Sequence, residues 1–240
     1  HPFAIMAADD PNITVYILGQ RSIGRTSLAY RLSTGEFLTE RVSVAHLQGY
    51  SSAAVDVENR NWIVHLHDPV RLPEGEPWWL PDNWHRIRKA EGLILAFSVT
   101  NRASFEVLDQ LYQGALETRK GGGVNYQTVP VVMAALCADA DPESRVVDRE
   151  EAAGKARAWG FPYFETSSKT GQDIQELLEG FVREAVGARS RRERLGLQEE
   201  EASLTSYVGK GMKRKKQKRR SDKTQKAAPS SALQNSCSIQ

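Results

Sequence analysis

The sequence predicts an α/β fold, in which a six-stranded, mostly parallel sheet is flanked by about five helices. Apolar β-branched runs alternate along the chain with segments of helical periodicity, and this alternation is typical of parallel sheets covered on both faces. The composition, with 40% hydrophobic and 26% charged residues, is that of a globular domain. The sequence contains no apolar run of about 18 residues, the length that a membrane-spanning helix needs.

Six segments are expected to be strands, because each is apolar or alternates in polarity and is bounded by glycine, proline or polar turns. The first, residues 13–19, is a β-branched run that ends in glycine. The others are residues 51–58, 61–68, 92–99, 129–136 and 163–166.

The helices are expected between these strands. Residues 104–119 place Phe105, Leu108 and Leu111 at helical spacing, and Gly160 is a suitable stop for a helix over residues 148–159. A further helix is expected to begin near Trp84. The remaining two predicted helices are residues 24–32 and 171–186.

Charge is distributed unevenly, although the whole chain is formally +2. Residues 190–240 carry thirteen basic and five acidic side chains, a net charge of +8, which leaves −6 on the preceding 189 residues. The basic segment also lacks hydrophobic periodicity, and a chain that buries little apolar surface is expected to be disordered. We therefore predict an N-terminal extension at residues 1–11, with Met6 as a candidate start, a folded domain at residues 12–189 and a basic tail at residues 190–240.

The chain has two cysteines, Cys137 and Cys237. Two cysteines cannot form a disulfide framework, and the first residues lack the basic and apolar parts of a secretory signal. A reducing, cytosolic environment is therefore expected. Cys137 ends an apolar run and is interpreted as a small hydrophobic residue rather than as a reactive thiol.

A phosphate-binding loop is predicted directly after the first strand. Residues 19–26, GQRSIGRT, have the spacing G-x-x-x-x-G-K-[ST], with arginine at the lysine position. In such a loop the backbone N–H groups surround a phosphate, a helix N-terminus adds its dipole, and a hydroxyl binds Mg²⁺. The alternative, for the motif taken alone, is an ordinary strand–glycine–helix turn. The predicted phosphate ligands are Gly19, Arg21, Ser22, Ile23, Gly24, Arg25, Thr26 and Ser27.

Other residues follow in an order that favours the phosphate-loop interpretation. Asp68 ends the third predicted strand, Asp139 follows the fifth, and the run ETSSK spans residues 165–169. In order and spacing, residues 12–188 resemble the Ras family of small GTPases. This resemblance implies a P-loop NTPase fold, binding of GTP and GDP with Mg²⁺, and signalling through effector or regulator proteins.

The resemblance also assigns the residues that read the base. It implies that Asp139 accepts hydrogen bonds from guanine N1 and N2. Ser167, Ser168 and Lys169 are then expected to close over the base, with the Ser168 backbone N–H on guanine O6. Phe37 stands at the position of an aromatic side chain that packs against the guanine.

Two residues are the implied metal site. By the resemblance, Thr26 is a direct Mg²⁺ ligand and Asp68 reaches the ion through water. The alternative roles are purely structural, a helix-capping threonine and an aspartate at a strand end.

Several positions depart from the family pattern. The motif N-K-x-D reads Leu136-Cys137-Ala138-Asp139, so the asparagine and the lysine that covers the purine are both replaced. These departures predict a lower affinity for guanine than in family members that keep the asparagine and the lysine.

The positions that handle the γ-phosphate depart as well. Arg71 replaces the glycine of D-x-x-G, and Leu72 replaces the glutamine that orients the attacking water. The threonine that senses Mg²⁺ falls at Val44, with Ser43 beside it, and Arg21 occupies a position that is usually small. We therefore expect weak binding and impaired hydrolysis, and assign no catalytic residue.

Residues 69–84 combine tryptophans with Pro69, Pro73, Pro77 and Pro81. Proline limits the conformations of a loop, whereas an order–disorder switch needs many. Trp78 and Trp79 are predicted to be a partner-binding surface, because tryptophan is enriched at interface hot spots. The alternative is that these rings cover the sheet, as we expect of Trp84.

The last residues, Cys237-Ser-Ile-Gln240, fit the C-a-a-X prenylation signal, and a final glutamine favours farnesyl. One lipid binds a membrane only marginally, and a basic run supplies the second signal on an anionic surface. Nuclear localisation or nucleic-acid binding would also use a basic run, but neither explains the cysteine. We expect attachment to the cytoplasmic face of the plasma membrane or an endomembrane. The basic run comprises Lys213, Arg214, Lys215, Lys216, Lys218, Arg219 and Arg220.

Two functions therefore remain open. The first is a divergent, monomeric Ras-like switch on a membrane, with slow GTP hydrolysis. The second is a pseudo-GTPase, a protein-interaction module with weak or no nucleotide binding. The sequence does not identify the effector, the exchange factor or the pathway.

Overall fold

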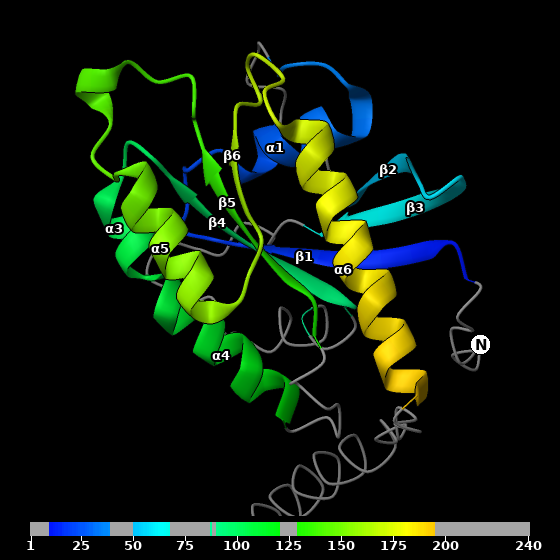
Figure 1. Ribbon diagram of the computed structural model, residues 1–240. Coiled ribbons are helices and arrows are strands. Elements are labelled where there is room, and N and C mark those ends of the chain that lie inside the picture. The colour runs from blue at the N-terminus through cyan, green and yellow to red at the C-terminus, as the bar shows by residue number, and fades with distance from the viewer. Residues whose placement is uncertain (1–9, 39–49, 68–86, 88–89, 121–128, 195–240) are drawn as a thin grey trace, which may run out of the picture. The chain divides into compact units, whose positions relative to one another are not determined.

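The central element of the computed structural model is a sheet of six strands. They are β1 (Asn12–Leu18), β2 (Tyr50–Val57), β3 (Arg60–His67), β4 (Gly92–Ser98), β5 (Val131–Leu136) and β6 (Tyr163–Thr166). The strands lie in the order β2-β3-β1-β4-β5-β6 (Figure 1). Strands β2 and β3 pair antiparallel, and the other neighbours pair parallel. This mixed, mostly parallel sheet confirms the predicted α/β class.

The structure describes residues 10–38, 50–67, 87, 90–120 and 129–194. All of them belong to the first of two compact units, His1–Glu200. None of the helices within these ranges is long and apolar enough to cross a membrane.

Helices cover both faces of the sheet. Helices α1 and α6 lie on one face, and α3, α4 and α5 lie on the other (Figure 1). The helices are α1 (Arg25–Thr34), α3 (Arg102–Glu106), α4 (Leu108–Lys120), α5 (Arg149–Trp159) and α6 (Ile174–Arg194), with a 3-10 turn at Pro142–Ser144.

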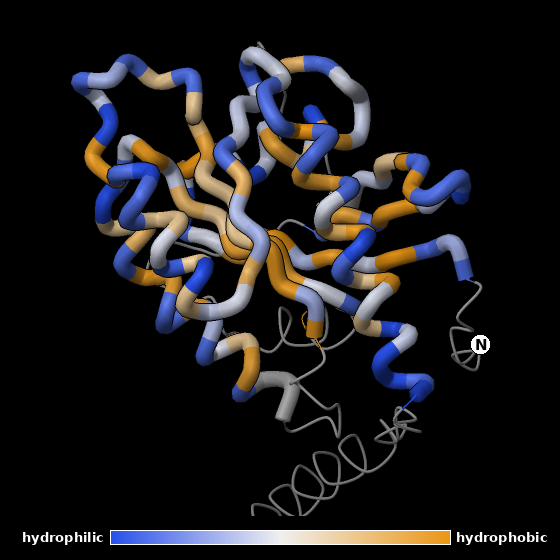
Figure 2. The backbone as a smooth tube through the Cα atoms, in the orientation of Figure 1, coloured by the Kyte–Doolittle hydropathy of each residue, from blue (hydrophilic) through white to orange (hydrophobic). Residues whose placement is uncertain are grey.

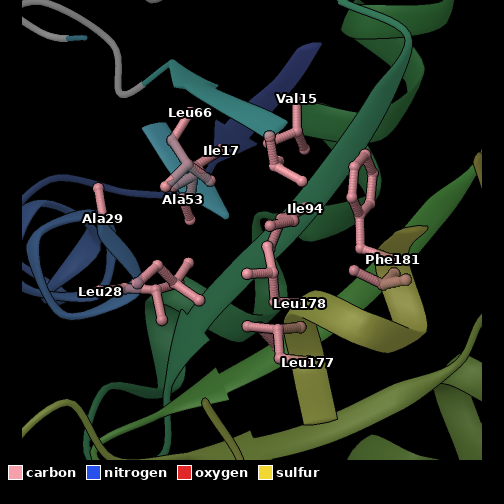
Figure 3. Packing of buried hydrophobic residues seen from close by; sticks show 14 of the residues in the cluster. Val15, Ile17, Leu28, Ala29, Ala53, Leu66, Ile94, Leu177, Leu178 and Phe181 are labelled. Atoms are coloured by element: carbon pink, nitrogen blue, oxygen red, sulfur yellow. The ribbon is translucent and has the colours of Figure 1, made fainter. Parts of the chain in front are cut away.

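Each face has its own hydrophobic cluster. On one face Ile17 and Ile94 of the sheet pack with Leu28 of α1 and with Leu178 and Phe181 of α6 (Figure 3). The central strands are hydrophobic along their length, whereas the exposed helix surfaces are hydrophilic (Figure 2). Burial on both faces explains why β4 and β5 are fully buried and read as continuous apolar runs rather than as alternating ones.

The parallel strands bring three loops together. Strands β1, β4, β5 and β6 run in the same direction, so their carboxyl ends meet at one edge of the sheet. Ligands of open α/β sheets bind at this edge. The loops that follow β1, β5 and β6 are those that contain the predicted phosphate and base ligands.

Helix α5 is capped at both ends, and its end at Gly160 was predicted. The Asp148 side chain accepts hydrogen bonds from the backbone N–H groups of Glu150 and Glu151 at the start of α5. Gly160 ends that helix in the left-handed conformation, with φ 74°. Both features agree with the predicted boundaries.

The predicted helix over residues 104–119 is in fact two helices, α3 and α4, which meet at Val107. The Asn101 side chain caps α3 by accepting a hydrogen bond from Ser104 N. The Ser104 hydroxyl donates to the Asn101 carbonyl at 2.6 Å and accepts the Ser98 backbone N–H at 3.0 Å. These bonds attach the first turn to the end of β4, a tertiary constraint that helical periodicity does not reveal.

The last helix is longer than predicted. We expected it to end at residue 186 and the disordered tail to begin at residue 190, but α6 continues to Arg194. The extension is stabilised because Ala185, Ala188 and Arg189 are buried against the sheet. Residues 190–194 are therefore helical, and the last turn is basic and hydrophilic (Figure 2).

Candidate functional site

The loop after β1 has the backbone shape of a phosphate cradle. Gly24 has φ 102° and Ser22 has φ 62°, both in the left-handed region. Gly19 approaches β4 so closely that an added Cβ would lie 2.5 Å from the Ala96 carbonyl oxygen. The two motif glycines are thus required for different reasons, one by its dihedral angle and one by a close approach.

The helix that follows this loop begins without a side-chain cap at Gly24. Within the described helix α1, the N-cap residue Gly24 makes no side-chain cap bond, and the first turn carries no acidic residue. Arg25 and Thr26 are its first two residues, and both are half-buried. The N–H groups of a helix N-terminus, its positive dipole end, a cation and a hydroxyl form the donor set that binds phosphate.

Asp139, which is predicted to read the base, is held by a serine from the neighbouring loop. The Ser167 hydroxyl donates to Asp139 Oδ1 at 2.6 Å. The same hydroxyl oxygen accepts the Thr170 backbone N–H at 3.1 Å, so its single hydrogen is left for the aspartate. Lys169 Nζ lies 4.0 Å from Asp139 Oδ2, with its side chain 70% exposed. The carboxylate is therefore oriented by Ser167 through Oδ1, while Oδ2 has a long ion pair with the exposed Lys169.

The loop after β6 is closed by its own backbone. Gly171 N donates to the Ser167 carbonyl at 2.9 Å, and Ser167 N donates to the Gln172 carbonyl at 3.1 Å. The loop is also joined to the other base loop, because Ala138 N donates to the Thr166 carbonyl at 3.0 Å. The backbone around Ser168, which is expected to meet guanine O6, is thus constrained from both sides.

An ion pair also connects the segment after β5 to strand β6. Arg145, from the segment after β5, pairs with Glu165 of β6, and the Tyr163 hydroxyl donates to the same carboxylate at 2.7 Å. Glu165 is buried. Burial, and then the bond to this carboxylate, raises the pKa of Tyr163 well above its ordinary value, so the phenol stays protonated as a donor.

The side chains at the two replaced positions of the base motif, Leu136 and Cys137, offer few polar groups to a ligand. Leu136 is buried at the end of β5. Cys137 has φ 62°, packs against both hydrophobic clusters, and directs its thiol to the Ile23 carbonyl of the phosphate loop at 4.0 Å. The thiol therefore contacts the phosphate loop, but it is too short to cover a purine ring as lysine would.

The aromatic residue that is predicted to pack against the guanine, Phe37, lies among the described residues. Phe37 follows α1 and is 37% exposed, one of the more exposed large hydrophobic side chains among the described residues. An exposed aromatic ring can gain apolar contact from a ligand.

The donor set fits a nucleotide with Mg²⁺. The residues that the structure describes contain no group of three or more His, Cys, Asp or Glu side chains able to hold a metal by themselves. Mg²⁺ commonly takes only one or two protein ligands and completes its shell with phosphate oxygens and water. Thr26 is the described residue suited to that role.

Several predicted residues lie outside the described ranges. They are the second metal residue Asp68, the γ-phosphate positions Ser43, Val44, Arg71 and Leu72, the partner surface Trp78 and Trp79, the prenylation residue Cys237, and the basic run from Lys213 to Arg220. These assignments stay predictions. Arg21, the remaining departure, is described and is exposed on the phosphate loop.

Two features of the site were missed by sequence reasoning. Arg145 lies in a polar segment, where nothing marks it as the partner of Glu165. Arg31 of α1 packs over Gly171, and the only available signal was a glycine just beyond the ETSSK run. Both contacts join segments that are distant in sequence.

Comparison with known proteins gives one family match. A sequence model of the Ras family matches residues 14–187, which is most of the chain. The match spans every strand except the beginning of β1, and all the described residues of the candidate site.

Individual relatives are distant. DnaJ homolog subfamily C member 27 of Danio rerio is 27% identical over 169 residues, which cover 70% of this chain and 59% of that protein. The Rattus norvegicus protein of the same name is 25% identical over 174 residues, 72% of this chain and 61% of that protein. GTPase RhebL1 of Mus musculus is 29% identical over 175 residues, 71% of this chain and 86% of that protein. The chain thus spans about three fifths of the length of the first two relatives.

Proposed function

The chain belongs to the Ras family, and from this membership we propose that it is a membrane-attached guanine-nucleotide switch with slow GTP hydrolysis. As a Ras-like small GTPase it has guanine nucleotide and Mg²⁺ as the ligands of its family, and effectors or regulators as partners. The observation that carries the proposal is the pair of Asp139 and Ser167, because the hydrogen bond from Ser167 orients a carboxylate that could accept the N1–H and N2–H groups of a guanine.

Different residues of the chain would bind the phosphates and the base. The phosphate loop from Gly19 to Thr26 would hold the phosphates through backbone N–H groups, with Arg25 as the cation. Asp139 and the Ser168 N–H would read the base, and Phe37 would pack against it. Mg²⁺, when bound, neutralises charge on the phosphate oxygens.

Slow hydrolysis is proposed from the side chains at the reaction end of the site. Leu72 has no polar atom with which to orient a water molecule, and Arg71 lacks the flexibility of the glycine that it replaces. The Arg21 side chain on the phosphate loop adds bulk where the family uses a small residue. Together they remove the groups that position water against the γ-phosphate.

The pseudo-GTPase alternative is favoured by one observation. At the lysine position of the base motif, Cys137 reaches only the Ile23 carbonyl, at 4.0 Å. A purine bound beside it would lack both the asparagine and the lysine contacts. If the remaining contacts are too few, the domain acts through protein contacts alone.

The nucleotide retained by the purified chain distinguishes these two functions. We expect mass spectrometry and chromatography of denatured protein to release GDP or GTP, and calorimetric titration with GTP to give a submicromolar Kd that depends on Mg²⁺. Absent or millimolar affinity would instead establish the interaction module. Single-turnover GTP hydrolysis, measured on the same preparation, is expected to be slower than for a family member that keeps glutamine at the Leu72 position.

Membrane attachment is the second part of the proposal. It is supported by the Cys237–Gln240 motif and by the basic run from Lys213 to Arg220, each basic residue contributing roughly 1 kcal/mol near an anionic surface. The basic last turn of α6 precedes this segment. The Trp78-Trp79 pair is proposed as the anchor for an effector or regulator protein.

Replacing Cys237 by serine is expected to move the protein from the membrane fraction to the supernatant, because one basic run without a lipid binds only weakly. The measurement is fractionation of cells that express the tagged full chain, together with the mass of the C-terminal peptide. Ser238→Ala, next to the acceptor, is the control and should stay membrane-bound. Unchanged fractionation of Cys237→Ser, or a peptide without a farnesyl mass increment, would refute the lipid anchor.

A further inference from the structure

The most informative contact outside the assigned residues joins α1 to the loop that reads the base. The Arg31 side chain, from the last turn of α1, lies over Gly171 in the loop between β6 and α6. An added Cβ on Gly171 would overlap Arg31 Nη2 and lie 3.4 Å from Cζ and 3.6 Å from Nε. Three atoms of one guanidinium at such distances mean that the group lies across the glycine. Gly171 also has φ +86°, so its backbone conformation favours glycine independently.

Gly171 makes two backbone hydrogen bonds that define the shape of its loop. Its N–H closes the turn on the Ser167 carbonyl at 2.9 Å, and its carbonyl accepts the Ile174 N–H at 3.5 Å at the start of α6. A displacement of Gly171 therefore moves the backbone of residues 167–170, which includes the N–H expected to meet guanine O6. The contact with Arg31 lies only three residues from Ser168.

The other end of the contact belongs to the phosphate site. Helix α1 begins at Arg25, directly after the phosphate loop, and Arg31 lies on the same rigid helix. A helix advances about 1.5 Å per residue and does not bend over so short a distance. A contact between Arg31 and Gly171 thus fixes the separation of the phosphate-binding and base-binding parts of the site.

We propose that Arg31 is a positioning residue for guanine recognition, holding the loop of residues 167–171 against α1, and that Gly171 is required because any side chain there displaces it. The inference rests on the proposed function in that it assumes a guanine nucleotide as the ligand. With the asparagine and lysine of the base motif replaced by Leu136 and Cys137, Asp139 and this loop supply the remaining contacts to the base.

The test uses the full chain and two readouts. Arg31→Ala is expected to speed amide hydrogen exchange in the peptide that covers residues 167–172 by about tenfold or more. The same change should raise the Kd for GDP about 5- to 20-fold, while the Kd for inorganic pyrophosphate, which occupies the phosphate site alone, stays within twofold. Arg31→Lys keeps the charge but not the planar group, and should restore part of the GDP affinity.

A second variant tests the role of the glycine. Gly171→Asn tolerates a positive φ but introduces a side chain, and alone it should resemble Arg31→Ala in both readouts. In the Arg31→Ala background it should add less than twofold, because both changes break the same contact. Arg157→Ala, which removes an exposed arginine of α5 with 69% of its side chain accessible, controls for the lost charge.

The outcomes separate this inference from the proposed function. If the parent chain binds no GDP, the proposed function fails, and hydrogen exchange still reports whether Arg31 holds the loop. If the parent chain binds GDP but Arg31→Ala leaves exchange and GDP affinity unchanged, the positioning role is wrong. Equal losses for GDP and pyrophosphate would likewise overturn it, because they would indicate a damaged phosphate site rather than a displaced base loop.

Discussion

Replacing Arg189 by alanine is expected to destabilise the folded domain by about 3–5 kcal/mol, the cost of leaving a buried carboxylate without its partner. Arg189 lies on α6 and pairs with Glu91, immediately before β4, in a bidentate arrangement with N–O distances of 2.7 and 2.8 Å. The two side chains are only 8% and 10% exposed. The stranded Glu91 charge is the reason that the effect is large.

The same guanidinium also satisfies backbone groups at the start of the sheet. Arg189 Nη1 donates to the Asp10 carbonyl at 2.6 Å, and Nη2 donates to the Asn12 carbonyl. The group lies 5.7 Å from the centre of the Trp62 ring, within range of a cation–π contact. One side chain thus joins the end of α6 to the beginnings of β1 and β4.

Urea denaturation followed by circular dichroism measures this effect. Arg183→Ala is the matched control on the same helix, because Arg183 pairs with Glu179 at the surface and should contribute at most about 0.5 kcal/mol. The double variant Arg189→Met/Glu91→Leu removes both charges and should recover part of the loss. If Arg189→Ala and Arg183→Ala have the same midpoint, the buried pair does not stabilise the domain.

The second large effect is expected at Asp139. Changing it to asparagine replaces one acceptor oxygen by an N–H donor, which meets the guanine N1–H and N2–H groups with the wrong polarity. One hydrogen bond to a charged acceptor is lost, worth about 1.5–3 kcal/mol, and the new N–H group faces another donor. GDP affinity should therefore fall at least about 100-fold. Affinity for xanthosine diphosphate, which presents a carbonyl at C2, should rise.

The measurement is competition of each nucleotide against a fluorescent guanine nucleotide. Asp141→Asn makes the same chemical change two residues away, on an exposed side chain, and should leave both affinities within twofold. The Ser167 hydroxyl can donate to the asparagine oxygen, so the fold should be preserved. A variant that binds GDP as tightly as the parent would show that Asp139 does not read the base.

Much of the fold was predictable because the local sequence pattern of these segments agrees with the structure that they form in the folded domain. The β-branched run at residues 13–19 is β1, and Gly160 ends α5 as expected. The prediction failed where a long-range contact decides the outcome. Helix α6 extends to Arg194 because Arg189 has a buried partner in Glu91, and composition alone indicated a disordered segment there.

The candidate site likewise combines residues that the sequence predicts with contacts that it does not predict. Gly19, Gly24 and Thr26 follow a spacing that exists for a local reason, since one loop must turn tightly and begin a helix. The pairing of Asp139 with Ser167 could be inferred only through family resemblance, because 28 residues separate them. Arg145 with Glu165, and Arg31 over Gly171, had no comparable signal.

The sequence by itself therefore determined the α/β class, the phosphate loop, the altered motif positions and the opposite charges of the domain and the basic segment. These properties depend on residue types at short spacing or on simple counts of charge. Only the tertiary structure decided that α6 continues to Arg194, that Arg189 is buried, and that Arg31 lies against the base loop. The physical reason is that a charged side chain is stable inside a fold only if a distant segment supplies its partner, and the sequence does not state which segment that is.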